Sequence, residues 1–454
     1  MKKIVYLVVL AVTFTACDSF LDIEPKGKVI PRTIDDYNLL LNGSEHTMHS
    51  LYNEDILALT ADDYILDPPN AGAMADISNP DYQDFQLYTW GEYRFYNEGV
   101  PVSAWNTAYE NLYTYNKIIN EVMEAAPGLE FSRESDKLRV RAEALYGRAS
   151  EYLFLVNTFA KAYSTTAGTD PGVPIVTKAD ITQTNLTRAS IKEVYDFIIN
   201  DLENALPDLP QRSYLFTRPN ISAAYALLAR THLYKGDYQK ASEYASKALE
   251  SNIYVLFDYN YLAPGGRQIR DRYQQQQYVS RYFGGIIGYT NGHLSDSFKN
   301  NIDQTNDKRY TLFFQEQGYK TTFLYYNSSV SVGEMYVTRA ECYARLGKKA
   351  EAIKDLNALR KFRIENATYT DLQVTDFATN KDLIKFALEE RRREMVGSQT
   401  RLFDVKRMNL EPDFAVTIIK EFQGKTYTAE PNSGKLVLPI PAQVLKFNPS
   451  WKRN

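Results

Sequence analysis

Two small groups of side chains are the best candidates for catalysis or metal binding. Asp62 and Asp63 form the strongest acidic pair, and His46 and His49 lie three residues apart. Adjacent side chains diverge in a helix or a strand, whereas the two carboxyl groups of a glycosidase lie about 5–10 Å apart across a cleft. The histidines lack the cysteine or carboxylate that would complete a metal site, and no Gly-x-Ser-x-Gly, His-Glu-x-x-His or phosphate-loop motif occurs. We therefore predict no catalytic residue, no metal and no cofactor.

Aromatic residues offer a different chemistry. The chain has 35 tyrosines and 3 tryptophans, whose rings can stack on the C–H face of a sugar while polar side chains bind its hydroxyls. They concentrate in residues 64–96 and 254–289. The candidate ligand-binding residues are Tyr64, Asn70, Tyr88, Trp90, Tyr93, Arg270, Tyr273, Tyr278, Tyr282 and Tyr289, with Trp90 and Tyr278 or Tyr282 as stacking platforms. The alternative for each ring is packing within its own loop.

The N-terminus has the pattern of an export signal. Lys2 and Lys3 precede an apolar run that is too short to span a bilayer, and Cys17 follows that run. We predict a signal peptide over residues 1–16 and lipid attachment at Cys17, with residues 18–32 as a tether. Without residues 1–16 the chain carries 50 basic and 56 acidic residues, a poor composition for nucleic-acid binding.

Helical periodicity dominates the rest of the chain. The patterns predict helices over residues 33–41, 105–122, 134–163 and 190–205, while residues 62–104 read as irregular. Two segments, 223–249 and 334–359, have the sequence pattern of tetratricopeptide helix pairs, and their turn glycines lie 111 residues apart. A single repeat cannot bury its apolar face, so the pairs should stack in space.

The expected fold is therefore mostly all-α, a helical body with tetratricopeptide-like pairs and long irregular insertions. We predict one domain over residues 17–454. Its N-terminal part spans about 18–210, and its C-terminal part spans about 215–454 with an insertion at about 252–330.

A charge run, Glu389–Glu394, lies near the C-terminus. It could form an anion site, but we favour a salt-bridged network that involves Arg401, Asp404 and Arg407. Cys342 lies among apolar residues of a helical pattern and is expected to be a buried, unreactive thiol.

Motifs along nearly the whole chain resemble the SusD/RagB family of surface glycan-binding lipoproteins of Bacteroidetes. The matching segments are Cys17–Asp22, Asp62–Tyr64, Arg141–Tyr163, Arg188–Leu202, Ser331–Gly347, Glu390–Arg407, Leu438–Pro441 and Asn448–Pro449. The chain departs from the family pattern at Gly397–Gln399, where Phe-Glu-Gly is usual.

The resemblance implies a protein that is not an enzyme and is lipid-anchored at the cell outer membrane, facing the exterior. Such a protein captures an oligo- or polysaccharide and delivers it to a SusC-like TonB-dependent transporter. Two alternatives remain open from the residues: the same role with a peptide ligand, or a repeat scaffold that binds only protein partners.

Overall fold

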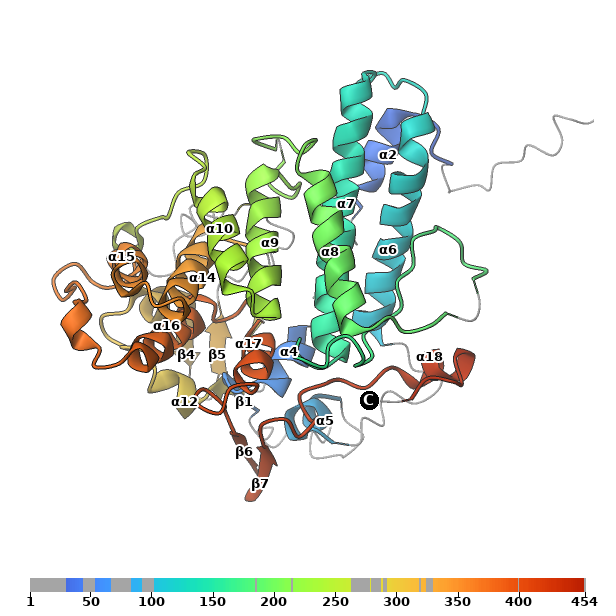
Figure 1. Cartoon of the computed structure of the whole chain (residues 1–454). Helices are drawn as coiled ribbons and strands as arrows, with labels where there is room; N and C mark the ends of the chain where they lie inside the picture. Colours follow the sequence, from blue (N-terminus) through green and yellow to red (C-terminus); the bar gives the residue numbers. More distant parts are fainter. Residues whose placement is uncertain are drawn as a thin grey trace, which may run out of the picture.

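Helices form most of the structure, and the strands are few and short (Figure 1). The prediction of a mostly all-α fold is confirmed. The computed structural model describes residues 30–43, 54–66, 83–91, 102–183, 186–213, 215–262, 278, 287–288, 292–317, 320–323, 330–398 and 400–452.

A row of packed helices forms the N-terminal half of the body. It consists of α6 (Ser103–Glu121), α7 (Glu134–Phe159) and α8 (Ile191–Ala205), which pack in chain order. α7 ends four residues earlier than expected because Ala160 has an extended backbone. Ser190 and Glu193 form the predicted capping box at the start of α8.

The short helix α2 (Ile34–Leu40) lies beside the turn between α6 and α7, where η3 (Val122–Glu124) continues α6. Thr33 caps α2 through a capping box with Asp36. The carboxylate of Asp35 accepts backbone N–H groups from Leu129, Glu130 and Phe131 at 2.7, 3.0 and 2.8 Å. α2 is therefore fastened to the turn that follows α6.

The two predicted helix pairs are confirmed, and they pack directly on each other. α9 (Ile221–Lys235) pairs with α10 (Tyr238–Leu249), α14 (Val332–Arg345) pairs with α15 (Lys349–Arg360), and α10 packs against α14. Equivalent small residues are buried in both pairs, such as Ala229 and Ala340. Arg339 joins three of these helices, because it pairs with Asp355 at 2.7 Å and donates to Ser246 at 3.2 Å. The insertion between the pairs leaves their stacking intact.

The C-terminal part closes against both halves. η5 (Val374–Asp376) precedes α16 (Asn380–Glu394), which packs on α14, and α17 (Arg401–Met408) follows. The Nζ of Lys406 on α17 donates to the carbonyls of Asn157 and Ala160 at the end of α7. The hairpin of β6 (Ile418–Phe422) and β7 (Lys425–Ala429) and the helix α18 (Ala442–Phe447) complete the chain.

The segments expected to be irregular contain secondary structure. Residues 62–104 include β1 (Tyr64–Leu66) and α5 (Gln83–Thr89), and α4 (Glu54–Thr60) precedes them. The 252–330 insertion contains η4 (Tyr259–Tyr261), β2 (Ile287–Gly288), β3 (Gly292–Leu294), α12 (Asp296–Lys299), α13 (Lys308–Phe313), β4 (Phe314–Gln317) and β5 (Lys320–Phe323). β5 pairs antiparallel with both β2 and β4. These elements are too short for a clear periodic signal, and the pairing partners of β1 and β2 are distant in sequence.

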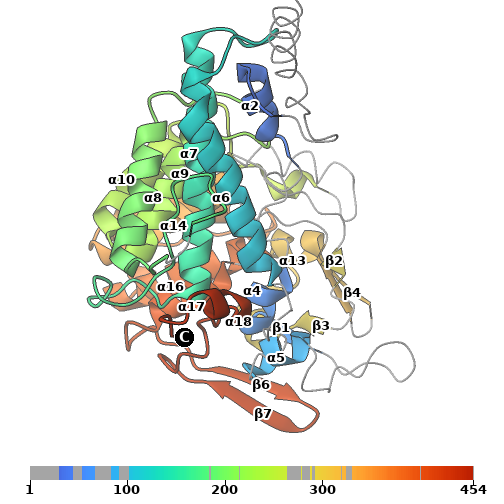
Figure 2. The same cartoon turned by 90° about the vertical axis from the view of Figure 1, so that its right-hand side faces the viewer.

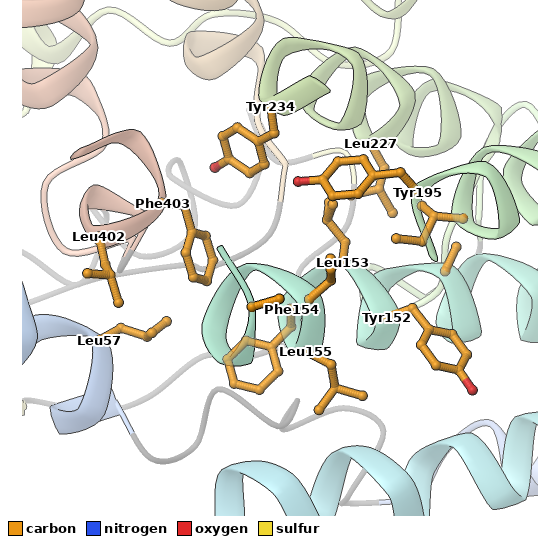
Figure 3. Close-up of a cluster of buried hydrophobic side chains, with 14 of the residues drawn as sticks. Leu57, Tyr152, Leu153, Phe154, Leu155, Tyr195, Leu227, Tyr234, Leu402 and Phe403 are labelled. Atoms are coloured by element: carbon orange, nitrogen blue, oxygen red, sulfur yellow. The ribbon is translucent and has the colours of Figure 1, made fainter. Parts of the chain in front are cut away.

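The largest hydrophobic core joins the two halves of the chain (Figure 3). Leu57 of α4, Leu153 of α7, Tyr195 of α8, Leu227 of α9 and Leu402 of α17 all belong to it. Each side chain is at most 4% exposed. The core therefore couples the N-terminal helices, the first helix pair and α17.

The turn glycines of the helix pairs allow a direct test of the repeat geometry. Gly236 and Gly347 have φ of 78° and 77°, and a Cβ at either position would contact nothing within 4 Å. Because the left-handed backbone is the only penalty, we expect Gly236→Ala or Gly347→Ala to lower the free energy of unfolding by about 1–2 kcal/mol. Chemical denaturation followed by circular dichroism measures this.

Gly168→Ala is the matched control, since Gly168 also has open space around its Cα but no positive φ. Equal losses of stability at all three glycines would show that the left-handed backbone of Gly236 and Gly347 is not the cause of the penalty.

Candidate ligand-binding site

A network of buried arginines and carboxylates is built around α16. Arg391 lies 2.9 Å from Asp404 and 3.4 Å from Glu334, and Glu334 also pairs with Arg230 of α9. The Nη1 of Arg391 donates to Thr338 at 2.9 Å. One arginine of α16 therefore contacts α14 and α17, and through Glu334 it reaches the first helix pair.

The same network extends from Arg391 to α17 and to the insertion. Arg407 contacts Asp404 at 2.8 Å and Glu341 at 2.5 Å. Glu390 and Glu394 contact Arg309 of the insertion at 2.8 and 3.2 Å. The predicted salt-bridged network is confirmed, because Arg391, Arg401 and Arg407 each face a protein carboxylate.

The acidic pair Asp62-Asp63 belongs to this network. Arg401 binds Asp62 with two hydrogen bonds of 2.7 and 2.8 Å. Arg392 lies 3.3 Å from Asp62 and 2.8 Å from Asp63. The expected divergence of the two carboxylates is thus wrong, because a bend before β1 lets one guanidinium contact both. Burial alone would raise the pKa of Asp62, but Arg401 and Arg392 outweigh it and hold this pKa below its usual range.

This acidic pair also joins the two aromatic segments at their base. β1 pairs antiparallel with β3, and Leu66 faces Gly292 at the end of the pairing. Beside it, the N–H of Ser295 donates to the Asp63 carbonyl at 2.8 Å, and its hydroxyl donates to the Asp62 carbonyl at 2.6 Å. Figure 2 shows β1 and β3 beside α4 and α5. The first segment leaves this ladder at Leu66, and the chain returns to it at Gly292, three residues after the second segment ends.

Tyr88 and Trp90 are buried, at 0% and 6% exposure, so the structure corrects the prediction of Trp90 as a stacking platform and of Tyr88 as an exposed ligand-binding residue. Both rings lie against the Nζ of Lys420, at 4.6 and 4.3 Å from the ring centroids. This lysine of β6 also donates to the carbonyl of Leu59. The Trp90 indole donates to the carbonyl of Thr60 at 3.2 Å. The two rings are buried because they enclose the Lys420 side chain, and burial lowers the pKa of its amine well below the usual value.

Tyr64 and Tyr278 are also buried, which corrects their assignment to an exposed surface. Tyr64 packs in a small apolar cluster with Leu294 and Phe298. The Tyr278 hydroxyl donates to the carbonyl of Ala248 at 3.0 Å, and its ring packs edge-to-face on Tyr254 at 5.3 Å. Burial raises the pKa of the Tyr278 hydroxyl. Tyr278 therefore attaches the second segment to the end of α10.

The other predicted residues lie outside the described part of the chain. They are Cys17, Asn70, Tyr93, Arg270, Tyr273, Tyr282 and Tyr289. His46 and His49 lie outside it as well.

Reactive groups in the described part are in structural positions. Cys342 is a buried free thiol, and burial raises its pKa, as expected of an unreactive cysteine. Among the described residues, no group of three or more His, Cys, Asp or Glu side chains could hold a metal ion. In the same part of the chain, no helix is sufficiently long and apolar to cross a bilayer.

An open groove that the sequence did not indicate runs along α6. Its walls are α6 and the segment that follows α7, and its volume is about 950 Å³. Trp105 and Tyr109 line it. Tyr113, which is 40% exposed, also lines it. The one signal in the sequence was the spacing of Trp105, Tyr109 and Tyr113, which places three aromatic rings four residues apart in the first half of the helix.

The buried network predicts a specific acid sensitivity. Burial alone would raise the pKa of Glu341, but Arg407 and Arg345 outweigh it and lower the pKa to about 2. An unfolded glutamate titrates near 4.3, so this stabilisation is present above about pH 5 and is lost as the pH falls toward 2. We expect Glu341→Gln to cost about 3–5 kcal/mol near neutral pH, since it leaves buried guanidinium groups without their carboxylate.

The difference in unfolding free energy between wild type and Glu341→Gln should shrink by about 2 kcal/mol by about pH 3. Denaturant titrations across this range measure it, with the exposed Glu351→Gln as control. A difference that is constant with pH would contradict the pKa shift.

Comparison with protein families gives two matches. The SusD-like_3 model, described as starch-binding associating with outer membrane, matches residues 19–233. The SusD_RagB model, described as SusD family, matches residues 332–454.

Two curated relatives match part of the chain. A "SusD-like protein P2" from Formosa agariphila is 28% identical over 284 residues, which are 58% of this chain and 51% of the relative. A "SusD-like protein" from Bacteroides ovatus is 25% identical over 265 residues, covering 55% and 44%. The chain thus spans about half the length of the curated relatives it matches.

Solved structures share the fold over nearly the whole chain. A SusD superfamily protein from Bacteroides thetaiotaomicron has a TM-score of 0.74 at 21% identity and covers 93% of this chain and 99% of its own. A putative sugar binding protein from Bacteroides vulgatus has a TM-score of 0.75 at 21% identity, covering 94% and 99%. Surface glycan-binding protein A from Bacteroides uniformis has a TM-score of 0.71 at 16% identity, covering 93% and 99%. With both family models matched and this fold, the chain belongs to the SusD/RagB family.

Proposed function

We propose that this protein captures a glycan at the outer membrane without cleaving it and delivers it to a SusC-like TonB-dependent transporter. The observation that carries the proposal is the pairing of β1, which begins the first aromatic segment, with β3, which begins three residues after the second aromatic segment ends. Proteins that share this fold include a putative sugar binding protein and surface glycan-binding protein A. Asn70, Tyr93, Arg270, Tyr273, Tyr282 and Tyr289 remain the proposed ligand-binding residues.

The chemistry of the buried carboxylates supports binding without catalysis. A glycosidase needs one carboxylic acid that protonates the leaving oxygen and a second carboxylate that acts as base or nucleophile. Asp62, Asp63 and Glu390 instead face arginines at 2.7–2.8 Å. The pKa of Glu390 is lowered to about 2, because Arg309 and Arg393 outweigh the effect of its burial. Such a group is a poor proton donor near neutral pH.

The proposed membrane attachment is a lipid on Cys17. The described chain begins at Ile30, and Thr33 forms a parallel bridge with Ala126 at the turn after α6. Asp35 binds the backbone of the same turn. A tether from Cys17 would therefore pull on the end of the α6–α7 pair, where the chain is well fastened.

Glycan capture is testable with purified protein. We expect titration calorimetry against glycan and peptide arrays to detect a glycan that binds without release of reducing ends. Arg270→Ala and Tyr282→Ala should each weaken that glycan about tenfold or more, since each removes a hydrogen-bonding or stacking group. The matched control is Phe216→Ala, an exposed aromatic residue between α8 and α9 with a 56% exposed side chain.

Release of reducing ends would overturn the non-catalytic role. Binding of peptides alone would replace the glycan with a peptide ligand. If the protein bound neither glycans nor peptides but still bound the transporter, the result would favour a scaffold that binds only proteins.

A further inference from the structure

The groove along α6 has walls that the fold holds in place. Three side chains of α6 donate to carbonyls of the neighbouring segment: Tyr109 to Pro174 at 2.9 Å, Asn116 to Val176 at 2.9 Å and Asn120 to Thr177 at 3.1 Å. These donors lie at steps of seven and four, so they share one face of the helix. The segment beside α6 is therefore fixed up to Thr177.

The segment is fixed again further along. The Trp451 indole donates to the carbonyl of Leu186 at 3.1 Å. Between these two attachments, Lys178, Asp180, Ile181 and Gln183 form the outer wall of the groove. Figure 1 shows this part of the chain looping out beside α6 before it enters α8. The groove is thus a built feature of the N-terminal half.

The groove is also long. A second hollow of about 540 Å³ shares Lys178 with the first and continues along α6 to Glu121. From Trp105 to Glu121 the helix rises by about 24 Å, at about 1.5 Å per residue. An extended chain of several units fits this shape better than a single compact molecule.

The groove combines an exposed aromatic ring with polar side chains that are available to a ligand. Tyr113 is 40% exposed on the helix wall, and Ile181 is 88% exposed on the opposite wall. The side chains of Asn106, Glu110 and Gln183 form no hydrogen bond with other side chains or backbone in the described part of the chain. Amide groups both donate and accept hydrogen bonds, and the carboxylate accepts. A ligand with apolar faces and hydroxyl edges matches this surface.

The charge of the lining restricts the ligand further. Among the described residues that line the larger groove, Lys178 is the only basic one, and it is accompanied by Glu110 and Asp180. A sulfated or uronic acid chain would need several arginines or lysines, since anions are held by charge-assisted hydrogen bonds. The lining therefore favours a neutral ligand.

A peptide is a poorer match for the same groove. Extended peptides bind largely through main-chain hydrogen bonds to an open backbone edge. Here the carbonyls of Pro174, Val176 and Thr177 already accept from α6. The N–H of Val176 is also used, because it donates to the Tyr152 hydroxyl at 2.7 Å.

We infer that this groove, lined by Tyr113, Asn106, Glu110 and Gln183, is a second binding site for a neutral glycan chain. It is separate from the site proposed at residues 64–96 and 254–289. It shares with the proposed function only the class of ligand.

Titration calorimetry with short neutral oligosaccharides tests this inference through stoichiometry. The probes are gluco-, xylo-, manno- and galacto-oligosaccharides, with sulfated and uronic oligosaccharides and a peptide pool as comparison arms. A ligand of the protein should bind wild type at two sites. In the double variant Tyr113→Ala/Gln183→Ala, affinity at one of these two sites, the groove site, should weaken about tenfold or more while the other site is unchanged. The exposed Phe216→Ala serves again as the control, and its binding should match wild type.

The outcomes separate this inference from the proposed function. A single site that is unaffected by the groove variant but lost in Arg270→Ala/Tyr282→Ala would overturn the groove and leave the proposed function standing. If wild type bound glycan at the groove alone, the result would overturn the site proposed at residues 64–96 and 254–289 instead. Groove binding restricted to peptides or to acidic glycans would overturn the inference. No binding of any neutral glycan would also overturn it, and no binding of any glycan, neutral or acidic, would overturn both proposals.

Discussion

The buried ion pairs of α16 are the constraint on which the rest of the structure depends. Arg391 connects α16 to the two helix pairs and α17, while Arg392 contacts Asp62 and Asp63 at the start of β1. A buried guanidinium without its carboxylate costs several kcal/mol, so each of these contacts holds together the elements that it joins. One short helix thus sets the position of both the scaffold and the base of the aromatic segments. The carboxylates of this network are consequently structural groups.

The scaffold could be predicted because its signals are local. Gly236 and Gly347 mark the turns of two helix pairs, and small residues such as Ala229 mark where helices approach closely. The salt-bridged character of the charge run was also predictable, from the spacing of opposite charges. Its distant partners were not, because Asp62 lies more than three hundred residues from Arg401, and no local pattern encodes such a contact.

The predicted site was harder, since composition does not distinguish a buried ring from an exposed one. Tyr88 and Trp90 have the residue types of a sugar platform, yet they enclose Lys420, which arrives from a strand near the other end of the chain. Tyr278 likewise attaches a loop to α10. The groove on α6 could not be predicted either, because its outer wall comes from a segment without a periodic pattern, so the sequence does not show that this segment lies beside α6. In both cases the side chain's role depends on a tertiary neighbour.

The dependence of the aromatic segments on α16 can be measured by hydrogen exchange of wild type and Arg392→Met. Removing this guanidinium leaves Asp63 without its partner at 2.8 Å. Exchange should accelerate in residues 62–66 and 292–295, where the β1–β3 ladder lies, while residues 223–249 stay as protected as in wild type. Unchanged exchange in the ladder, or a uniform increase over the whole chain, would show that the network does not hold the base of these segments.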